Sequence, residues 1–318
     1  LAQALPPLAA RLQEVRDGLE HRPPDDALAL VTAIRADAEA AGEDAVVAGA
    51  ARLIGALQLR QERFSAARPA LEQAMALYAR LGDRRNELEA QVLLGRALTY
   101  SGDQARAREI VPAALRELRT MDVPRDALLA TFSQGLFALG IDHDDHAELL
   151  AAALALIPEG EQPRAACSLW QTEGDMLFHR ADCVRAHESL TRAFSCYQAH
   201  QERSLAGRVL VSLGRVQRAH GQLHTALEYY TRAAAMQVAE GDVPSWLQSL
   251  NAQAVTYDRL GQQEKAEALY RQAIAIAARD RLERYIVFLQ GNLAGSLLGA
   301  GRYAEALPVL EATVAAEK

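Results

Sequence analysis

A pattern of apolar and small side chains repeats along the whole chain, and residues 250–277 show it most clearly. Ala254 and Tyr257 belong to one predicted helix, which ends at Gly261. A second stripe follows with the four- and three-residue spacing of one helix face. Its members are Ala266, Tyr270 and Ala273. The segment therefore predicts two amphipathic helices joined by a glycine turn.

The small residue of the first helix recurs at intervals of 40, 40, 39, 40, 40 and 40 residues, at Gly55, Gly95, Gly135, Gly174, Gly214, Ala254 and Ala294. Alanine stands twelve residues after each, at Ala67, Ala107, Ala147, Ala186, Ala226, Ala266 and Ala306. A glycine or alanine lets two helices approach more closely than the usual 8 to 10 Å. The chain is therefore predicted to contain seven stacked helix pairs, preceded by a degenerate eighth pair.

These positions resemble the tetratricopeptide repeat, whose consensus has a small residue, then alanine, then a second small residue. The third position is alanine in five units, while Leu154 and Thr313 depart from it. The usual repeat has 34 residues, so the 40-residue period is similar to that of long repeats in bacterial signalling and transcription regulators. The resemblance implies an all-α fold, a right-handed α-solenoid (superhelix) of stacked antiparallel helix pairs.

Two segments are expected within this solenoid. Residues 1–43 are predicted to form the degenerate N-terminal pair, a cap with helices at 8–19 and 27–41 and a turn at 21–26. Residues 44–318 are predicted to form the seven repeats as one continuous solenoid domain. Because solenoids require a polar cap and none follows the last helix, we expect the chain to be part of a longer protein.

Composition narrows the class of protein. The net charge of −7 argues against direct nucleic-acid binding, which leaves a basic footprint. No apolar run reaches the 18 residues of a membrane span. With no signal peptide in the sequence shown, a cytoplasmic location is expected. The three cysteines cannot all pair, and we expect them to be unpaired packing residues in a reducing compartment.

In the family that the chain resembles, the first helix of each repeat lines a concave groove. Transferring its inward positions gives a candidate groove of Arg52, Arg96, Tyr100, Phe132, Leu136, Gln171, Asp175, His179, Arg208, Arg215, Arg218, Asn251 and Arg259. Arginines outnumber acids at these positions, which favours an acidic protein or peptide partner. The alternatives are arginines that pair with acids of neighbouring units or point to water, and a Phe132–Leu136 anchor that is ordinary packing between units.

A stripe of glycines at 291, 295 and 299 lies on one face of the first helix of the last pair. Glycine costs about 1 kcal/mol relative to alanine inside a helix, so the stripe calls for a reason. Gly291, Gly295 and Gly299 are predicted to allow close approach of another helix, from a partner, from a second copy in a homo-oligomer or from a continuation of the chain. The alternative is a loosely packed terminal unit.

Two groups of residues have the right atoms for a metal ion, yet neither predicts a site. His143 and His146, with the aspartates at 142, 144 and 145, lie on a turn, where an aspartate more simply caps the next helix. The pairs Cys183/His187 and Cys196/His200 are about 20 Å apart along one helix, so they cannot share a zinc ion. No metal, cofactor or catalytic residue is predicted, and no enzyme motif occurs.

The predicted function is a protein–protein interaction scaffold that binds a peptide or helix of a partner in the arginine-bearing groove. One alternative is the sensory or regulatory region of a larger bacterial signalling protein, with an attached output domain such as a diguanylate cyclase or a DNA-binding regulator. Another is a receptor for a small ligand or short peptide.

Overall fold

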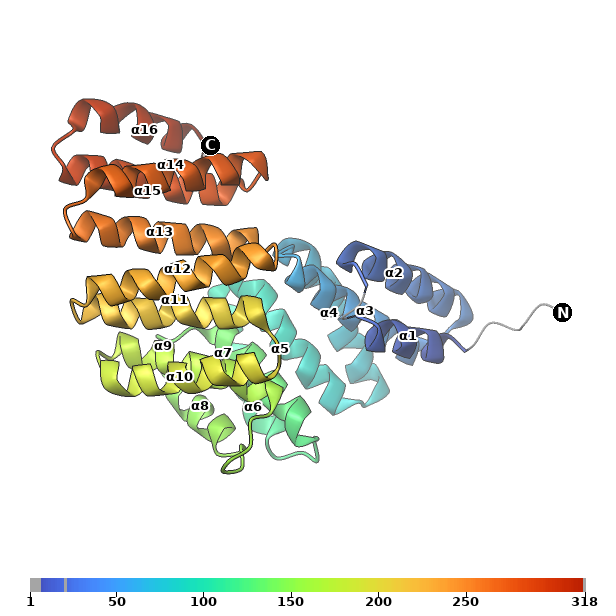
Figure 1. Cartoon of the computed structure of the whole chain (residues 1–318). Coiled ribbons are helices and arrows are strands. Elements are labelled where there is room, and N and C mark those ends of the chain that lie inside the picture. Colours follow the sequence, from blue (N-terminus) through green and yellow to red (C-terminus); the bar gives the residue numbers. More distant parts are fainter. Residues whose placement is uncertain (1–6, 20–21, 317–318) are drawn as a thin grey trace. The chain divides into compact units, whose positions relative to one another are not determined.

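The computed structural model describes residues 7–19 and 22–316, and this part of the chain contains helices and short connections but no strand (Figure 1). The chain divides into two compact units, one ending at Glu161 and the other beginning at Gln162. In each unit, consecutive helices pack against one another. The predicted fold class, an all-α solenoid of stacked helix pairs, is confirmed.

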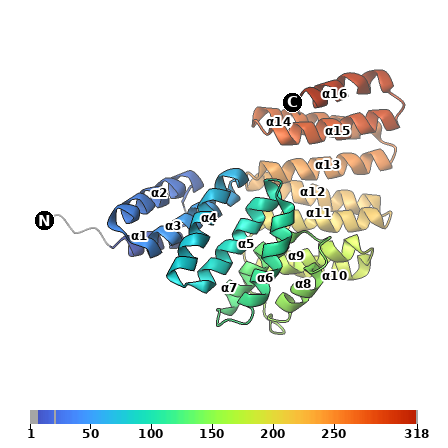
Figure 2. The same cartoon turned by 180° about the vertical axis from the view of Figure 1, so that it is seen from behind.

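The first unit contains eight helices, which Figure 2 shows from behind. Their bounds are α1 Leu8–Asp17, α2 Pro24–Ala41, α3 Asp44–Arg60, α4 Phe64–Leu81, α5 Arg84–Tyr100, α6 Gln104–Leu118, α7 Arg125–Leu139 and α8 His146–Leu154. The first helices of successive pairs, α3, α5 and α7, also contact one another and form one layer.

The second unit contains α9 to α16, stacked in chain order (Figure 1). Their bounds are α9 Arg164–His179, α10 Cys183–Ala199, α11 Arg203–Ala219, α12 Leu223–Ala239, α13 Val243–Arg259, α14 Gln263–Arg279, α15 Glu283–Gly299 and α16 Tyr303–Ala316. Here α9, α11, α13 and α15 contact one another in sequence and form the corresponding layer. Within the described part of the chain, no helix has the length and apolar character that a membrane crossing requires.

The small residues of the repeat pattern lie where helices touch. Five of them are glycines whose added β-carbon would stand only 2.1 to 2.7 Å from a side chain of an adjacent helix, namely Gly55, Gly95, Gly135, Gly174 and Gly214. Ala254 and Ala294 are fully buried, as are the second-helix alanines of six units, Ala67, Ala107, Ala186, Ala226, Ala266 and Ala306. The predicted register is therefore confirmed. Ala147, on the short helix α8, is only half-buried.

The N-terminal pair forms with shifted bounds, and α1 ends at Asp17, two residues before the predicted end. Helix α2 begins at Pro24, three residues before the predicted start, with Asp25 and Asp26 in its first turn. Proline suits this first position because its missing N–H has no partner there and its φ is already helical. His21 of the predicted turn lies outside the described residues. The boundary at 43/44 stays a prediction.

The turn between the first and second 40-residue repeats forms as the sequence indicates. Gly82 takes the left-handed conformation, with φ 71°, after α4 ends at Leu81. The Asp83 side chain then accepts a hydrogen bond from the backbone N–H of Asn86 at the start of α5. Both features satisfy backbone groups that a helix end leaves unpaired.

Helix α8 is the shortest of the described helices, with nine residues. The chain leaves it at residue 155 and does not resume a helix until Arg164. Pro158 and Pro163 stand in this connection, where proline disfavours helical continuation. The short helix accounts for the single 39-residue spacing.

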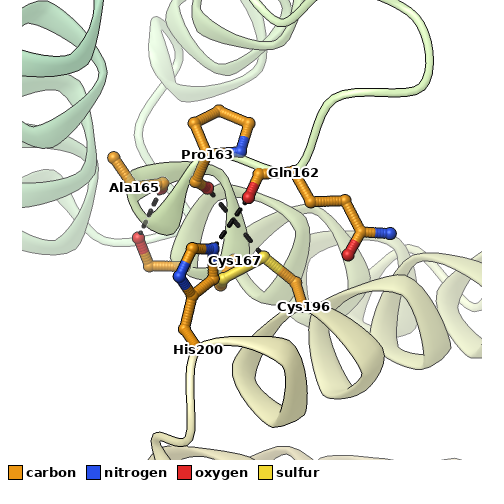
Figure 3. Close-up of a disulfide and its surroundings, with 7 residues drawn as sticks. Gln162, Pro163, Ala165, Cys167, Cys196 and His200 are labelled. Atoms are coloured by element: carbon orange, nitrogen blue, oxygen red, sulfur yellow. Dashed lines mark hydrogen bonds between the residues drawn. A yellow bond between two sulfur atoms is a disulfide. The ribbon is translucent and has the colours of Figure 1, made fainter.

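One expectation about the cysteines is wrong. Cys167 of α9 and Cys196 of α10 form a disulfide, and Cys183 is free (Figure 3). The two antiparallel helices bring the α-carbons of Cys167 and Cys196 to 5.3 Å, although 29 residues separate them in sequence. The sequence analysis paired cysteines only with histidines on the same helix and did not consider a cysteine on the neighbouring helix.

Candidate functional site

The predicted groove residues of the first unit are largely engaged with their neighbours. Arg52 of α3 forms an ion pair with Glu89 of α5, and Glu89 is also 3.1 Å from Arg85. Arg96 of α5 donates a hydrogen bond of 3.1 Å to Gln134 of α7. For Arg52 the alternative describes the contact, because it pairs with an acid of the neighbouring repeat, whereas Arg96 bonds to an amide.

Tyr100 lies in an aromatic stack at the ends of three helices. Its ring centroid is 4.5 Å from that of Phe64 and 6.0 Å from that of Phe137. Arg96 also lies over the Phe137 ring, 5.1 Å from its centroid. Tyr100 and Phe137 are each nearly half exposed, so the stack is accessible from solvent.

Phe132 and Leu136 lie in the core. Their exposed fractions are 0% and 1%, so neither side chain is available to a partner at the surface. Both face the inter-helix contacts of α7, and the packing alternative describes them. We therefore leave them out of the groove proposed below.

In the second unit, Asp175 connects two repeats. Its Oδ1 accepts a 2.9 Å hydrogen bond from Ser212 of α11 and lies 3.9 Å from the guanidinium of Arg215. Arg215 also lies over the ring of Phe178, 5.1 Å from the centroid. Burial raises the pKa of the Asp175 carboxyl, and the positive charge of Arg215 opposes that rise.

The other two candidates on α9 flank Asp175. Gln171 lies one turn earlier and is half-buried, while His179 is exposed at the end of the helix. The His179 ring packs edge-on against Phe178, with centroids 5.9 Å apart. All three predicted α9 residues thus lie along one helix, and Asp175 among them contacts the Arg215 side chain.

A cavity of about 620 Å³ opens between α11, α13 and α15. We call it the arginine groove. Its polar lining consists of Arg215, Arg218, Gln248, Asn251, Arg284 and Asn292. Val211, Ala252, Val255, Tyr285 and Phe288 complete it, and no carboxylate is among the lining residues. The volume falls in the range of small-ligand and peptide sites.

Arg218 is the most confined cation of this groove. It is half-buried, and its pKa is lowered by burial first and then by the charges of Arg259 and Arg215. Within the described residues, the Arg218 side chain makes no hydrogen bond or ion pair with an acid. The same holds for Arg208 and Arg259, which are exposed on α11 and α13. These three candidate arginines therefore have no acid at ion-pair distance among the described residues.

Asn251 of α13 is hydrogen-bonded to Asn292, which the sequence analysis did not predict as a groove residue. Its Oδ1 accepts a 2.8 Å hydrogen bond from Nδ2 of Asn292 on α15. Asn292 and Arg284 of α15 line the groove but were not among the transferred positions. The only available signal was that Asn292 follows Asn251 by 41 residues, one residue more than the repeat.

The glycine stripe of α15 faces open space. A β-carbon at Gly291, Gly295 or Gly299 would have no neighbour within 4 Å. Nothing in the described chain therefore approaches this face closely. The predicted docking of another helix stays a prediction.

The histidine and aspartate turn before α8 is held by arginines. Asp142 lies 2.6 Å from Arg108, and Asp145 lies 2.8 Å from Arg116. These bonds lower the pKa of both carboxyl groups. Asp145 is the N-cap residue of α8, yet its side chain makes no capping hydrogen bond. For Asp145 the expected cap is wrong, because its carboxylate bonds to Arg116 of α6 instead.

Part of the chain matches a known family of repeats. Residues 205–279 match the family model described as tetratricopeptide repeat. The matched segment therefore consists of tetratricopeptide repeats. The matched residues cover α12, α13 and α14 completely and most of α11, and they include much of the arginine groove.

Solved structures share the fold at low sequence identity. The apo form of the quorum sensor NprR from B. thuringiensis has a TM-score of 0.72 and 11% identity, over 98% of this chain and 87% of that one. A Rap protein complexed with competence and sporulation factor has a TM-score of 0.64 and 13% identity, covering 98% and 97%. Aspartyl phosphate phosphatase F from Bacillus subtilis has a TM-score of 0.56 and 11% identity, covering 100% and 96%. No curated protein matches the chain in sequence.

Proposed function

We propose that this protein binds an acidic segment of a partner protein or peptide in the arginine groove. The observation that carries the proposal is Arg218, which has no acid at ion-pair distance among the described residues and belongs to a lining without a carboxylate. Arginine binds carboxylates through two parallel hydrogen bonds. A carboxylate of the bound segment would supply the acid that Arg218 lacks.

The amide groups of the groove suit a peptide. Gln248, Asn251 and Asn292 line it beside the arginines, and a side-chain amide can both donate to and accept from a peptide backbone. The apolar side of the lining offers contact area for one or two side chains of the guest. Among the proteins of similar fold, the Rap protein was crystallised in complex with competence and sporulation factor, which supports binding of a partner factor by this fold.

The experiment is a binding titration with fluorescein-labelled peptides of fixed length that contain zero, two or four acidic residues. We expect affinity to rise with acidic content. The Arg218→Ala variant should weaken binding by about tenfold or more, since hydrogen bonds to charged groups contribute about 1.5–3 kcal/mol.

The matched control is Arg232→Ala, which removes an exposed arginine of α12 that does not line the groove. It should leave peptide affinity within twofold of the wild type. Equal losses in the two variants would show that only the overall charge matters, and affinity independent of acidic content would contradict the proposal.

A second candidate function, a small-ligand receptor, is favoured by a cavity in the first unit. This cavity of about 700 Å³ is lined by apolar side chains that include Leu12, Val46 and Leu53, with Arg16 and Arg52 among its polar residues. A thermal-shift screen with small amphipathic anions tests it, because a ligand that binds only the folded state raises the melting temperature. Leu53→Trp, which fills the cavity, should abolish any such shift.

A further inference from the structure

Three side chains that can bind a soft metal ion meet where α9 packs against α10. One ligand atom each from Cys167, Cys196 and His200 lies within 4.8 Å of the other two. Both cysteines are fully buried, and His200 is exposed just after the last residue of α10. Figure 3 shows the imidazole ring beside the two sulfur atoms.

The backbone before α9 holds the imidazole in place. Nε2 of His200 lies 2.8 Å from the carbonyl oxygen of Gln162, and Sγ of Cys196 lies 3.9 Å from the carbonyl oxygen of Pro163. Metal-binding histidines commonly have one ring nitrogen bonded to a backbone carbonyl, which fixes the orientation of the ring. The ring is therefore positioned beside the sulfurs without any ion.

We propose that Cys167, Cys196 and His200 bind a Zn²⁺ ion when the disulfide is reduced. Two thiolates and an imidazole are preferred zinc ligands, with Zn–S about 2.3 Å and Zn–N about 2.0 Å. Tetrahedral geometry with these bond lengths separates the ligand atoms by about 3.5–3.8 Å. The sulfur atoms are 2.04 Å apart in the disulfide, so after reduction rotation of the two cysteine side chains must separate them to this distance, while a ring nitrogen of His200 already lies within 4.8 Å of both. Water on the exposed side of His200 supplies the fourth ligand.

The disulfide and the zinc complex exclude each other because they use the same sulfur atoms. Two molecules of a thiol reductant transfer two electrons and two protons to the disulfide, which yields two cysteine thiols and one oxidised, disulfide-linked reductant. Zn²⁺ then displaces the two thiol protons into solvent. In either state α9 and α10 stay joined, by a covalent bond or through the ion.

The test uses the full chain, reduced with a phosphine, exchanged into oxygen-free buffer and titrated with Co²⁺ as a spectroscopic probe. We expect one Co²⁺ per chain, a thiolate-to-cobalt charge-transfer band in the near ultraviolet, and loss of that band when Zn²⁺ is added. The unreduced protein should show no band. A reduced protein without the band, or equal bands in the two states, would overturn the proposal.

Variants identify the ligands. Cys167→Ser should remove most of the band. His200→Ala should weaken Co²⁺ affinity by more than about tenfold, because changes in outer-shell partners alone cost 10–100-fold. Unchanged affinity in His200→Ala would overturn the assignment, and circular dichroism establishes that both variants fold.

The chain provides a matched control in Cys183 and His187. They have the same spacing on the same helix but are absent from the cluster around Cys167. Cys183→Ser and His187→Ala should each leave the band and the affinity unchanged. Loss of the band in either of them would move the ion to that pair and overturn the proposal.

Discussion

Gly214 of α11 lies directly against the ring of Tyr230 on α12, such that a β-carbon on Gly214 would stand 2.4 Å from Cε1 of the tyrosine. The Tyr230 side chain is fully buried, so it has no free space into which to move. The repeat therefore has a glycine at this position because a larger side chain would clash with Tyr230.

We predict that Gly214→Ala destabilises the protein by about 1–3 kcal/mol, because an added methyl group overpacks a filled contact. The control is Gly295→Ala on α15, where nothing lies within 4 Å of the added carbon. That variant should instead gain about 0.5–1 kcal/mol from helix propensity. Urea denaturation of both variants checks the opposite signs, and a stabilised Gly214→Ala variant would contradict the register.

The buried carboxyl of Asp175 leads to a prediction about how protein stability depends on pH. Its pKa is raised mainly by burial, so the folded state holds this proton more tightly than the unfolded chain does. The free energy of unfolding then falls as pH rises through the raised pKa. Asp175→Asn removes this cost and should have a higher melting temperature than the wild type at pH 7, with a difference that shrinks as pH falls towards 4.

Asp142 provides the control for that experiment. The hydrogen bond from Arg108 lowers the pKa of its carboxyl, so ionised Asp142 favours the folded state. Asp142→Asn should therefore lower the melting temperature at pH 7 or leave it unchanged. A parallel response of the two variants would show that the buried position of Asp175 has no special effect.

The disulfide predicts a redox dependence of stability. A cross-link across the 29 residues between Cys167 and Cys196 stabilises by about 3–4 kcal/mol in the chain-entropy account. Metal-free protein should therefore melt at a lower temperature after phosphine reduction. Cys183→Ser should show the same decrease, and an unchanged melting temperature of the reduced wild type would contradict the prediction.

Salt should weaken peptide binding in the arginine groove. The screening length falls from about 10 Å at 0.1 M to about 3 Å at 1 M ionic strength, and an acidic peptide would be attracted by the guanidinium groups that line the groove. We expect the dissociation constant of a tetra-acidic peptide to rise steadily over that range, while a neutral peptide responds little. Fluorescence anisotropy at four salt concentrations is the measurement.

The sequence predicted the parts of the fold that local sterics dictate. Gly95, for example, must be small because Val111 occupies the space of a β-carbon, and such positions recur with the helix pairs. Contacts between repeats were harder, since Arg52–Glu89 and Asp175–Ser212 depend on how one first helix is rotated against the next. The spacing alone does not determine that rotation.

The same limit explains why the groove residues were only partly predicted and why the disulfide was not predicted. Transferring inward positions found Arg218 and Asn251 but also included Phe132, which is buried, because burial depends on the neighbouring helices. Cys167 and Cys196 meet across a helix pair, and their levels along the two antiparallel helices follow from the length of the connecting turn. No periodic pattern marks that coincidence.

The connection between α8 and α9 has a practical use. It contains Pro158 and the exposed residues Glu159 and Gly160, and it lies where the two units divide. A fluorescent tag or a protease recognition sequence inserted after Gly160 would leave the hydrophobic cores of both halves intact. The two halves could then be released from one purified chain and assayed separately, each with its own cavity.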